Sequence, residues 1–127
     1  GTLHIKKNLS LDGGLINCNN KINLIDEKPI FIFDCLIKSN NSKKFLKNFS
    51  VSKNKLKEEY LNIKIRGNLD LIKNKINFLN IEMNNSYKAS ANDLNFFKNS
   101  FEKFFLTKSL LDNLNKENIN KFIFEIL

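Results

Sequence analysis

The chain of 127 residues is long enough for one domain, and its 42% hydrophobic residues can bury a core, which excludes bulk disorder. The net charge is +8, but Arg66 is the one arginine among 21 basic residues, and the lysines are scattered along the sequence. Nucleic-acid-binding surfaces combine arginine, a basic stripe and aromatic platforms, so a nucleic-acid partner is not favoured. No run approaches the roughly 20 apolar residues of a membrane-spanning helix.

The first residues already alternate apolar and polar side chains, as Leu3 and Ile5 show. A sequence that opens on glycine inside a strand pattern indicates a fragment, so we expect residues 1–127 to be a single domain or part of a longer repeat protein. The strongest strand is expected at 30–38, where most side chains on both faces are apolar. Such a strand needs cover on both sides.

An internal repeat is the most informative feature. Residues 9–24 and 63–78 align without a gap, so that Gly13 matches Gly67 and the tetrapeptide Asn-Lys-Ile-Asn recurs at the same offset. Self-similarity at a fixed period indicates a stacked architecture. We therefore expect the two segments to fold alike, with both glycines at equivalent bends or bulges.

The second copy shows the expected strand order most clearly. Alternation up to Arg66 is interrupted by Gly67, resumes through Leu71, and is followed by turn-forming residues at 73–75. The return strand begins at Ile76, and its alternation changes parity after Phe78, which predicts a bulge. A further turn and a short last strand are expected before residue 90.

Amphipathic helices are expected after each set of strands, at 42–49 and 92–105, and again at 116–127. The predicted fold class is α+β. It contains an open, groove-like antiparallel sheet built from two strand-hairpin-helix units, about 1–53 and 54–105, and a C-terminal helical segment at 106–127.

The two cysteines leave two alternatives open. Cys18 and Cys35 lie in strand-like apolar runs, where they are either small buried side chains or, in an oxidising compartment, a disulfide. With His4 as the single histidine and no Cys-x-x-Cys pair, a metal-ligand set is missing, and no metal or other cofactor is expected.

The acidic residues do not form a catalytic pair, because they lie in predicted turns and on polar faces. Asp34 is the one acid within a strongly apolar strand, and an outward edge-strand charge or a hydrogen-bonded acid explains it. The segment Asp12-Gly13-Gly14 lacks the lysine and hydroxyl residue that complete a phosphate-binding loop. We therefore expect a chain that is not an enzyme.

Two segments resemble the AsmA-like family of bacterial envelope proteins, in its divergent form from AT-rich alphaproteobacteria. They are IKIRGNLDLIKNKINFLNIEMNNSYKASANDLNFFKNSF (63–101) and FIFDCLIKSNNSKKFLKNFSVSK (31–53). The resemblance implies a long, open β-groove with an apolar interior, anchored in the inner membrane by the parent protein and lying on its periplasmic side. It also implies that phospholipid acyl chains are the ligand, for transport between membranes or for outer-membrane assembly.

The residues expected to face lipid share strand positions that alternate with polar neighbours. They are Phe31, Phe33, Ile63, Ile65, Leu69, Leu71, Ile76 and Phe78. Two alternatives come from the positive charge: a basic nucleic-acid-binding module, and a peripheral domain that holds anionic membrane surfaces through lysine and exposed phenylalanine. A closed core under the helices would instead leave the same residues without a ligand.

Overall fold

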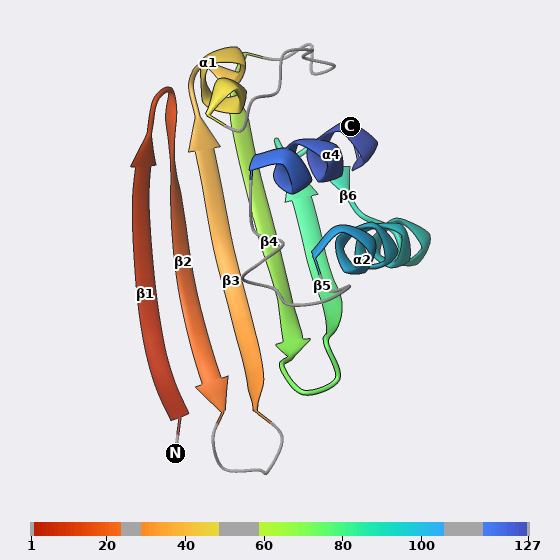
Figure 1. The fold of residues 1–127 in the computed structure, drawn as a ribbon. Coiled ribbons are helices and arrows are strands. Elements are labelled where there is room, and N and C mark those ends of the chain that lie inside the picture. The colour runs from red at the N-terminus through yellow and green to blue at the C-terminus, as the bar shows by residue number, and fades with distance from the viewer. Residues whose placement is uncertain (1, 24–28, 49–58, 106–115, 127) are drawn as a thin grey trace.

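The structure, a computed structural model, describes residues 2–23, 29–48, 59–105 and 116–126. Within them, six strands form one open antiparallel sheet in sequence order, with helices beside it, so the predicted α+β class is confirmed (Figure 1). The strands are Thr2–Leu11 (β1), Gly14–Asn23 (β2), Ile30–Ser39 (β3), Leu61–Asp70 (β4), Lys75–Met83 (β5) and Tyr87–Lys88 (β6). The helices are Ser42–Lys47 (α1), Ala91–Phe105 (α2) and Lys116–Ile126 (α4).

A tight hairpin opens the sheet. Leu11 stands opposite Gly14, and the two-residue turn between them places Gly13 at a φ of 82°, a conformation that suits glycine. Strand β3 pairs with β2 and β4 along its whole length, so the strand predicted at 30–38 lies inside the sheet and not at an edge.

The predicted bulge is confirmed between β4 and β5. Arg66 pairs with Asn80 and Gly67 with Phe78, which leaves Leu79 as the extra residue on β5. The extra residue explains the change of parity after Phe78, because it shifts the following side chains by one position.

The sequence alignment between the two halves does not hold in the structure. Residues 15–23 form one continuous strand, whereas the aligned segment 69–77 contains the turn at 71–74. Gly13 lies in a hairpin turn and Gly67 lies within β4, so the predicted equivalence of the two glycines was wrong. What both halves share is the order of elements, three strands and then a helix.

A single side chain explains why the second half turns earlier. The Asp70 carboxylate accepts hydrogen bonds from the backbone N–H groups of Ile72 (3.0 Å) and Lys73 (2.9 Å). Such bonds stabilise a turn in place of a strand. The aligned position in the first half is Ile16, whose side chain offers no acceptor, and the strand continues there.

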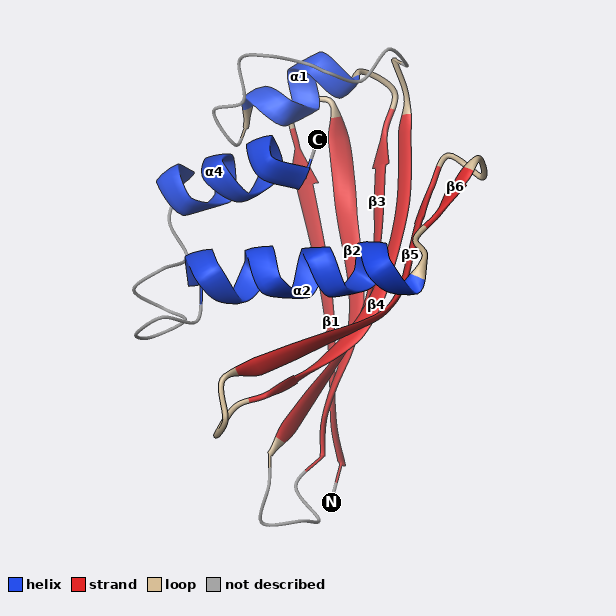
Figure 2. Ribbon diagram, turned by 90° about the vertical axis from the view of Figure 1, so that its right-hand side faces the viewer, coloured by secondary structure: helices blue, strands red, loops and turns tan. Residues whose placement is uncertain are grey.

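The sheet has two different faces. The outer face is mostly polar, although the apolar side chains of Leu15 and Ile32 are exposed on it. Its neighbouring strands bring opposite charges together, as in Asp34 opposite Arg66 and Asp70 opposite Lys75. The inner face is apolar and carries the helices, and Figure 2 shows α2 and α4 together on one side of the twisted sheet. Among the described residues, six apolar side chains are buried: Phe45, Leu46, Leu61, Leu69, Ile76 and Phe105.

Helix α1 closes one end of the inner face. The Ser39 hydroxyl donates to the Gly13 carbonyl (2.6 Å), and the Asn48 side-chain amide donates to the Asp12 carbonyl (2.8 Å). Phe45 is buried there, close to Gly14, where any side chain would collide with its ring. The expected helix at 42–49 is thus present as Ser42–Lys47, and residue 49 lies outside the described residues.

Helix α2 starts with reciprocal capping bonds. The Ser90 hydroxyl accepts from the Asp93 N–H (3.2 Å), and the Asp93 carboxylate accepts from the Ser90 N–H (3.1 Å). The helices expected at 92–105 and 116–127 are present as α2 and α4, while residues 24–28, 106–115 and 127 fall outside the described part of the chain.

Candidate apolar binding face

Cross-strand register gathers the apolar side chains on the inner face. Leu3 stands opposite Ile22, Ile22 opposite Phe31, and Phe31 opposite Leu69, so one apolar row crosses four strands. A second row joins Leu9 to Ile16, Ile37, Ile63 and Met83. Alternation at each strand produces this face, because side chains two residues apart point the same way.

Helices cover the half of this face that lies over β4 and β5. Phe78 contacts Phe101 of α2 with ring centroids 6.0 Å apart, and Phe101 contacts Phe122 of α4 at 5.7 Å. The side chains of Leu69 and Ile76 are only 6% and 3% exposed to solvent. The part of this half around Leu69 and Ile76 therefore belongs to the core.

The half over β1 and β2 is open. Leu3, Leu9 and Ile5 are 50%, 45% and 36% exposed, although they lie on the same face as the core. Helix α2 packs on β5 and α4 packs on α2, and Figure 1 shows no described helix over β1 and β2 away from the α1 end. The sheet thus extends an apolar surface beyond its own core.

The eight residues predicted to face lipid divide into three groups. Leu69 and Ile76 are buried beneath the helices, so they belong to the core. Leu71 lies in the turn after β4, where it is 43% exposed, because Asp70 ends the strand before it. The other five are half-buried on the inner face: Phe31, Phe33, Ile63, Ile65 and Phe78.

The most exposed apolar residues of the inner face were not among those eight. Leu3, Ile5 and Leu9 alternate with polar neighbours in the sequence, so the strand signal was present. Their exposure depends on where α2 docks, and the pattern of β1 contains no information about that.

Cys18 and Cys35 form a disulfide, which resolves the alternatives left open by the sequence. They stand directly opposite each other on β2 and β3, with Cα atoms 4.1 Å apart, and their side chains lie on the inner face. The crosslink therefore joins the open half of the face to the central strands.

Two polar side chains interrupt the open half. Lys7 stands opposite Cys18, and Asn20 stands between Ile5 and Phe33. The side-chain oxygen of Asn20 is buried and has no hydrogen-bond partner among the described residues. The open half is thus apolar with a small polar strip along β1 and β2.

A charge-assisted hydrogen bond joins β6 to α2. The Tyr87 hydroxyl donates to the Asp93 carboxylate at 2.8 Å. Burial, together with this hydrogen bond and the nearby negative charge, raises the pKa of Tyr87 to about 12. Hydrogen bonds from Tyr87 and Ser90 hold the pKa of the Asp93 carboxyl below its ordinary value. The pair anchors α2 and lies away from the open half.

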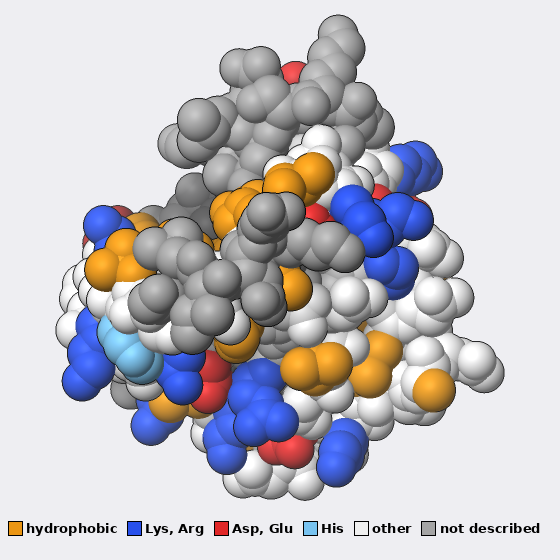
Figure 3. Space-filling model, turned by 90° about the horizontal axis from the view of Figure 1, so that it is seen from below, with side chains coloured by type: hydrophobic (Ala, Val, Ile, Leu, Met, Phe, Trp, Pro, Cys, Tyr) orange, Lys and Arg blue, Asp and Glu red, His pale blue; other side chains and the backbone are white. Residues whose placement is uncertain are grey.

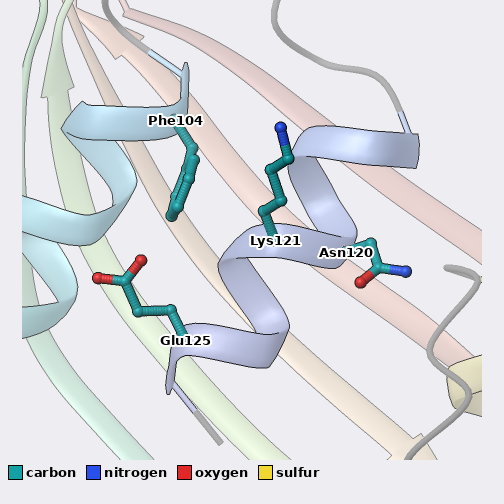
Figure 4. Close-up of a pocket in the computed structure, with 4 residues that line it drawn as sticks. All are labelled: Phe104, Asn120, Lys121 and Glu125. Carbon is teal, nitrogen blue, oxygen red and sulfur yellow. The ribbon is translucent and has the colours of Figure 1, made fainter.

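A shallow depression lies between α2 and α4 (Figure 4). It is lined by Phe104, Asn120, Lys121 and Glu125. Lys121 pairs with Glu117 at 3.1 Å, and Glu125 accepts a bond from Ser100 at 3.2 Å, so both charges serve helix packing.

In the described ranges, no group of three or more His, Cys, Asp or Glu side chains is placed to hold a metal ion. No described helix is both long enough and apolar enough to cross a bilayer. A comparison of the chain with known protein families, curated proteins and solved structures found no match in any of the three.

Proposed function

We propose that this chain is a non-enzymatic module of the bacterial cell envelope whose inner face binds phospholipid acyl chains. The observation that carries the proposal is the exposure of Leu3, Ile5 and Leu9 on the same face as the core. The resemblance of 31–53 and 63–101 to AsmA-like proteins supports it and suggests lipid transport between membranes or outer-membrane assembly as the setting.

The chemistry of the open half suits an acyl chain. Hydrocarbon binds by removing apolar area from water, at roughly 25 cal/mol per Å², and needs no directional partner. The strands offer a row of aliphatic and aromatic side chains that continues from Leu3 through Ile22 to Phe31. An extended chain lying along this row would contact several strands at once.

The disulfide supports an envelope location. Disulfides persist in oxidising compartments such as the bacterial periplasm and are rare in the cytosol. The Cys18–Cys35 bond therefore favours the periplasmic side of the inner membrane, with attachment through a parent protein.

Photo-crosslinking tests the proposal directly. A benzoylphenylalanine residue replaces Leu9 on the inner face or Ser10 on the outer face of the same strand, and the protein is irradiated with phosphatidylglycerol or phosphatidylethanolamine vesicles. Mass spectrometry should find lipid adducts at position 9 and few at position 10, because adjacent strand residues face opposite sides. Equal yields at both positions, or no adducts, would contradict an acyl-binding face.

The effect of salt distinguishes acyl-chain binding from the two alternatives based on positive charge, a membrane-surface domain and a nucleic-acid-binding module. Capture through apolar contact should persist in 1 M salt, whereas binding through lysine to anionic headgroups should be lost. Loss of capture in salt, with anionic lipid required, would identify a peripheral membrane-surface domain. Salt-sensitive binding of a single-stranded oligonucleotide without lipid adducts would identify a nucleic-acid-binding module.

A further inference from the structure

The two edges of the sheet differ in how their outward backbone groups are paired. At the β5 edge, α2 supplies polar side chains to the backbone of Ile76: Lys98 donates to its carbonyl at 2.6 Å, and Glu102 accepts from its N–H at 3.3 Å. Near the other end of β5, Glu82 and Met83 pair with the two-residue strand β6. Both ends of this edge are therefore blocked against the addition of a long strand.

The β1 edge has no such protection among the described residues. Strand β1 pairs with β2 over all ten residues without a bulge, and no other described segment pairs with it. Figure 1 shows β1 as the last described element on that side of the sheet. A long, regular, unpaired edge is a template for strand addition.

The hairpin register shows which backbone groups face outward. Leu11 and Gly14 flank a two-residue turn and are therefore a hydrogen-bonded pair, so alternate residues back along β1 also bond to β2. The backbone groups of the intervening residues point to the open edge. These residues are Thr2, His4, Lys6, Asn8 and Ser10.

The side chains at this edge carry positive charge without compensation. Lys6 and Lys7 lie at the centre of β1, and Lys21 of β2 stands opposite His4. Neither β1 nor β2 contains an acidic residue. Figure 3 shows the histidine side chain (pale blue) flanked by lysine or arginine (blue) on the β1 side of the molecule.

We infer that the open edge of β1 binds an extended peptide strand with acidic side chains on the outer face and apolar side chains on the inner face. Its acidic residues would lie near Lys6 and Lys21, and its apolar residues would continue the row that includes Ile5. A second copy of the chain fits less well. Two β1 strands paired antiparallel about their centre bring Lys6 against Lys6 or Lys7 against Lys7.

Two ten-residue peptides test the inference with the intact chain. Both alternate isoleucine with a charged residue, which is glutamate in one and lysine in the other, and binding is followed by fluorescence anisotropy. The glutamate peptide should bind at least about tenfold more tightly than the lysine peptide. Lys6→Glu combined with Lys21→Glu should reverse that preference. Equal affinity for both peptides would overturn the proposal.

Backbone pairing is tested separately. Asn8→Pro removes an outward N–H and should weaken the glutamate peptide about tenfold, while the matched change Asn8→Ala should alter its affinity less than twofold. In the unmodified chain, bound peptide should slow hydrogen exchange at the amides of Lys6 and Asn8 but leave Lys7 unchanged. Binding without this alternating protection would indicate charge attraction alone and contradict strand addition. Self-association without peptide binding would identify a second copy as the occupant.

Discussion

Gly67 shows how one residue can be essential without unusual backbone geometry. Its φ is not in the left-handed region, yet a Cβ atom there would lie 2.3 Å from the Asn77 carbonyl oxygen and 2.6 Å from the Phe33 ring. The close approach of β5 at the bulge, and of Phe33 across from β4, is what requires glycine. Gly67 thus lies at a bulge, as predicted, but its environment differs from that of Gly13, which lies in a hairpin turn.

We expect Gly67→Ala to lower the free energy of unfolding by about 2 kcal/mol, because an added methyl group must displace the backbone or the ring. Urea denaturation measures the change. Arg66→Ala, at the exposed neighbouring position, is the control and should stay within about 0.5 kcal/mol of the unmodified chain. A Gly67→Ala protein as stable as the control would show that β5 can move away freely.

The Tyr87–Asp93 pair predicts how stability depends on pH. The pKa of Asp93 is lowered from 3.8 in the folded chain, so its contribution is present above about pH 4 and is lost as pH falls through the lowered value. The pKa of Tyr87 is raised to about 12, so the contribution of the neutral phenol is lost as pH rises from 10 through 12.

We therefore expect Asp93→Asn to be less stable than the unmodified chain at pH 6, and the difference in unfolding free energy should shrink as the Asp93 carboxylate is protonated at acidic pH. For Tyr87→Phe, the difference in unfolding free energy from the unmodified chain should shrink in the same way at acidic pH, because this change removes the donor of the same hydrogen bond. Urea denaturation at a series of pH values provides the measurement. A difference that does not vary with pH would mean that the carboxylate charge does not contribute.

Helix α2 is the element that joins the sheet to α4, because it packs on β5 and on α4. Its phenylalanines differ sharply in environment: Phe101 contacts Phe78, Phe105 and Phe122, whereas Phe96 is 45% exposed. This difference between two faces agrees with the amphipathic helix predicted at 92–105. The same helix also satisfies the edge of β5 through Lys98 and Glu102.

Phe101→Ala should lower the free energy of unfolding by about 3 kcal/mol, because it removes the ring that links β5 to both helices. Phe96→Ala is the matched control on the same helix and should change stability by less than about 0.5 kcal/mol. Thermal and urea denaturation monitored by circular dichroism measure both variants. Equal losses would indicate that α2 packs on the sheet through a different face.

At the scale of the molecule, the disulfide is the covalent link between the open half of the sheet and its centre. Cys18 and Cys35 are separated by 17 residues, and closing a loop of that size stabilises a fold by about 3 kcal/mol. The double change Cys18→Ala and Cys35→Ala should therefore lower the unfolding free energy by about that amount under oxidising conditions. In reducing buffer the two proteins should unfold at nearly the same urea concentration. If the double variant still unfolded at a lower urea concentration there, its loss of stability would come from altered packing and not from the missing disulfide.

The sequence by itself determined the element types, because alternation and helical spacing are local properties that survive in the folded chain. The strand at 30–38, the bulge after Phe78 and the helices at 92–105 and 116–127 were all predicted from such patterns. Where one local pattern competed with another, prediction failed. At Leu71 continuing alternation indicated a strand, but the Asp70 carboxylate favoured a turn.

Tertiary structure alone decided which apolar residues are core and which are surface. Leu69 and Leu3 have the same alternating context, yet Leu69 is 6% exposed and Leu3 is 50% exposed, because α2 and α4 pack over one half of the inner face. The Cys18–Cys35 pairing likewise follows from the register of β2 against β3, which brings together residues far apart in sequence. Long-range docking and register depend on contacts between distant segments, and no local periodicity specifies them.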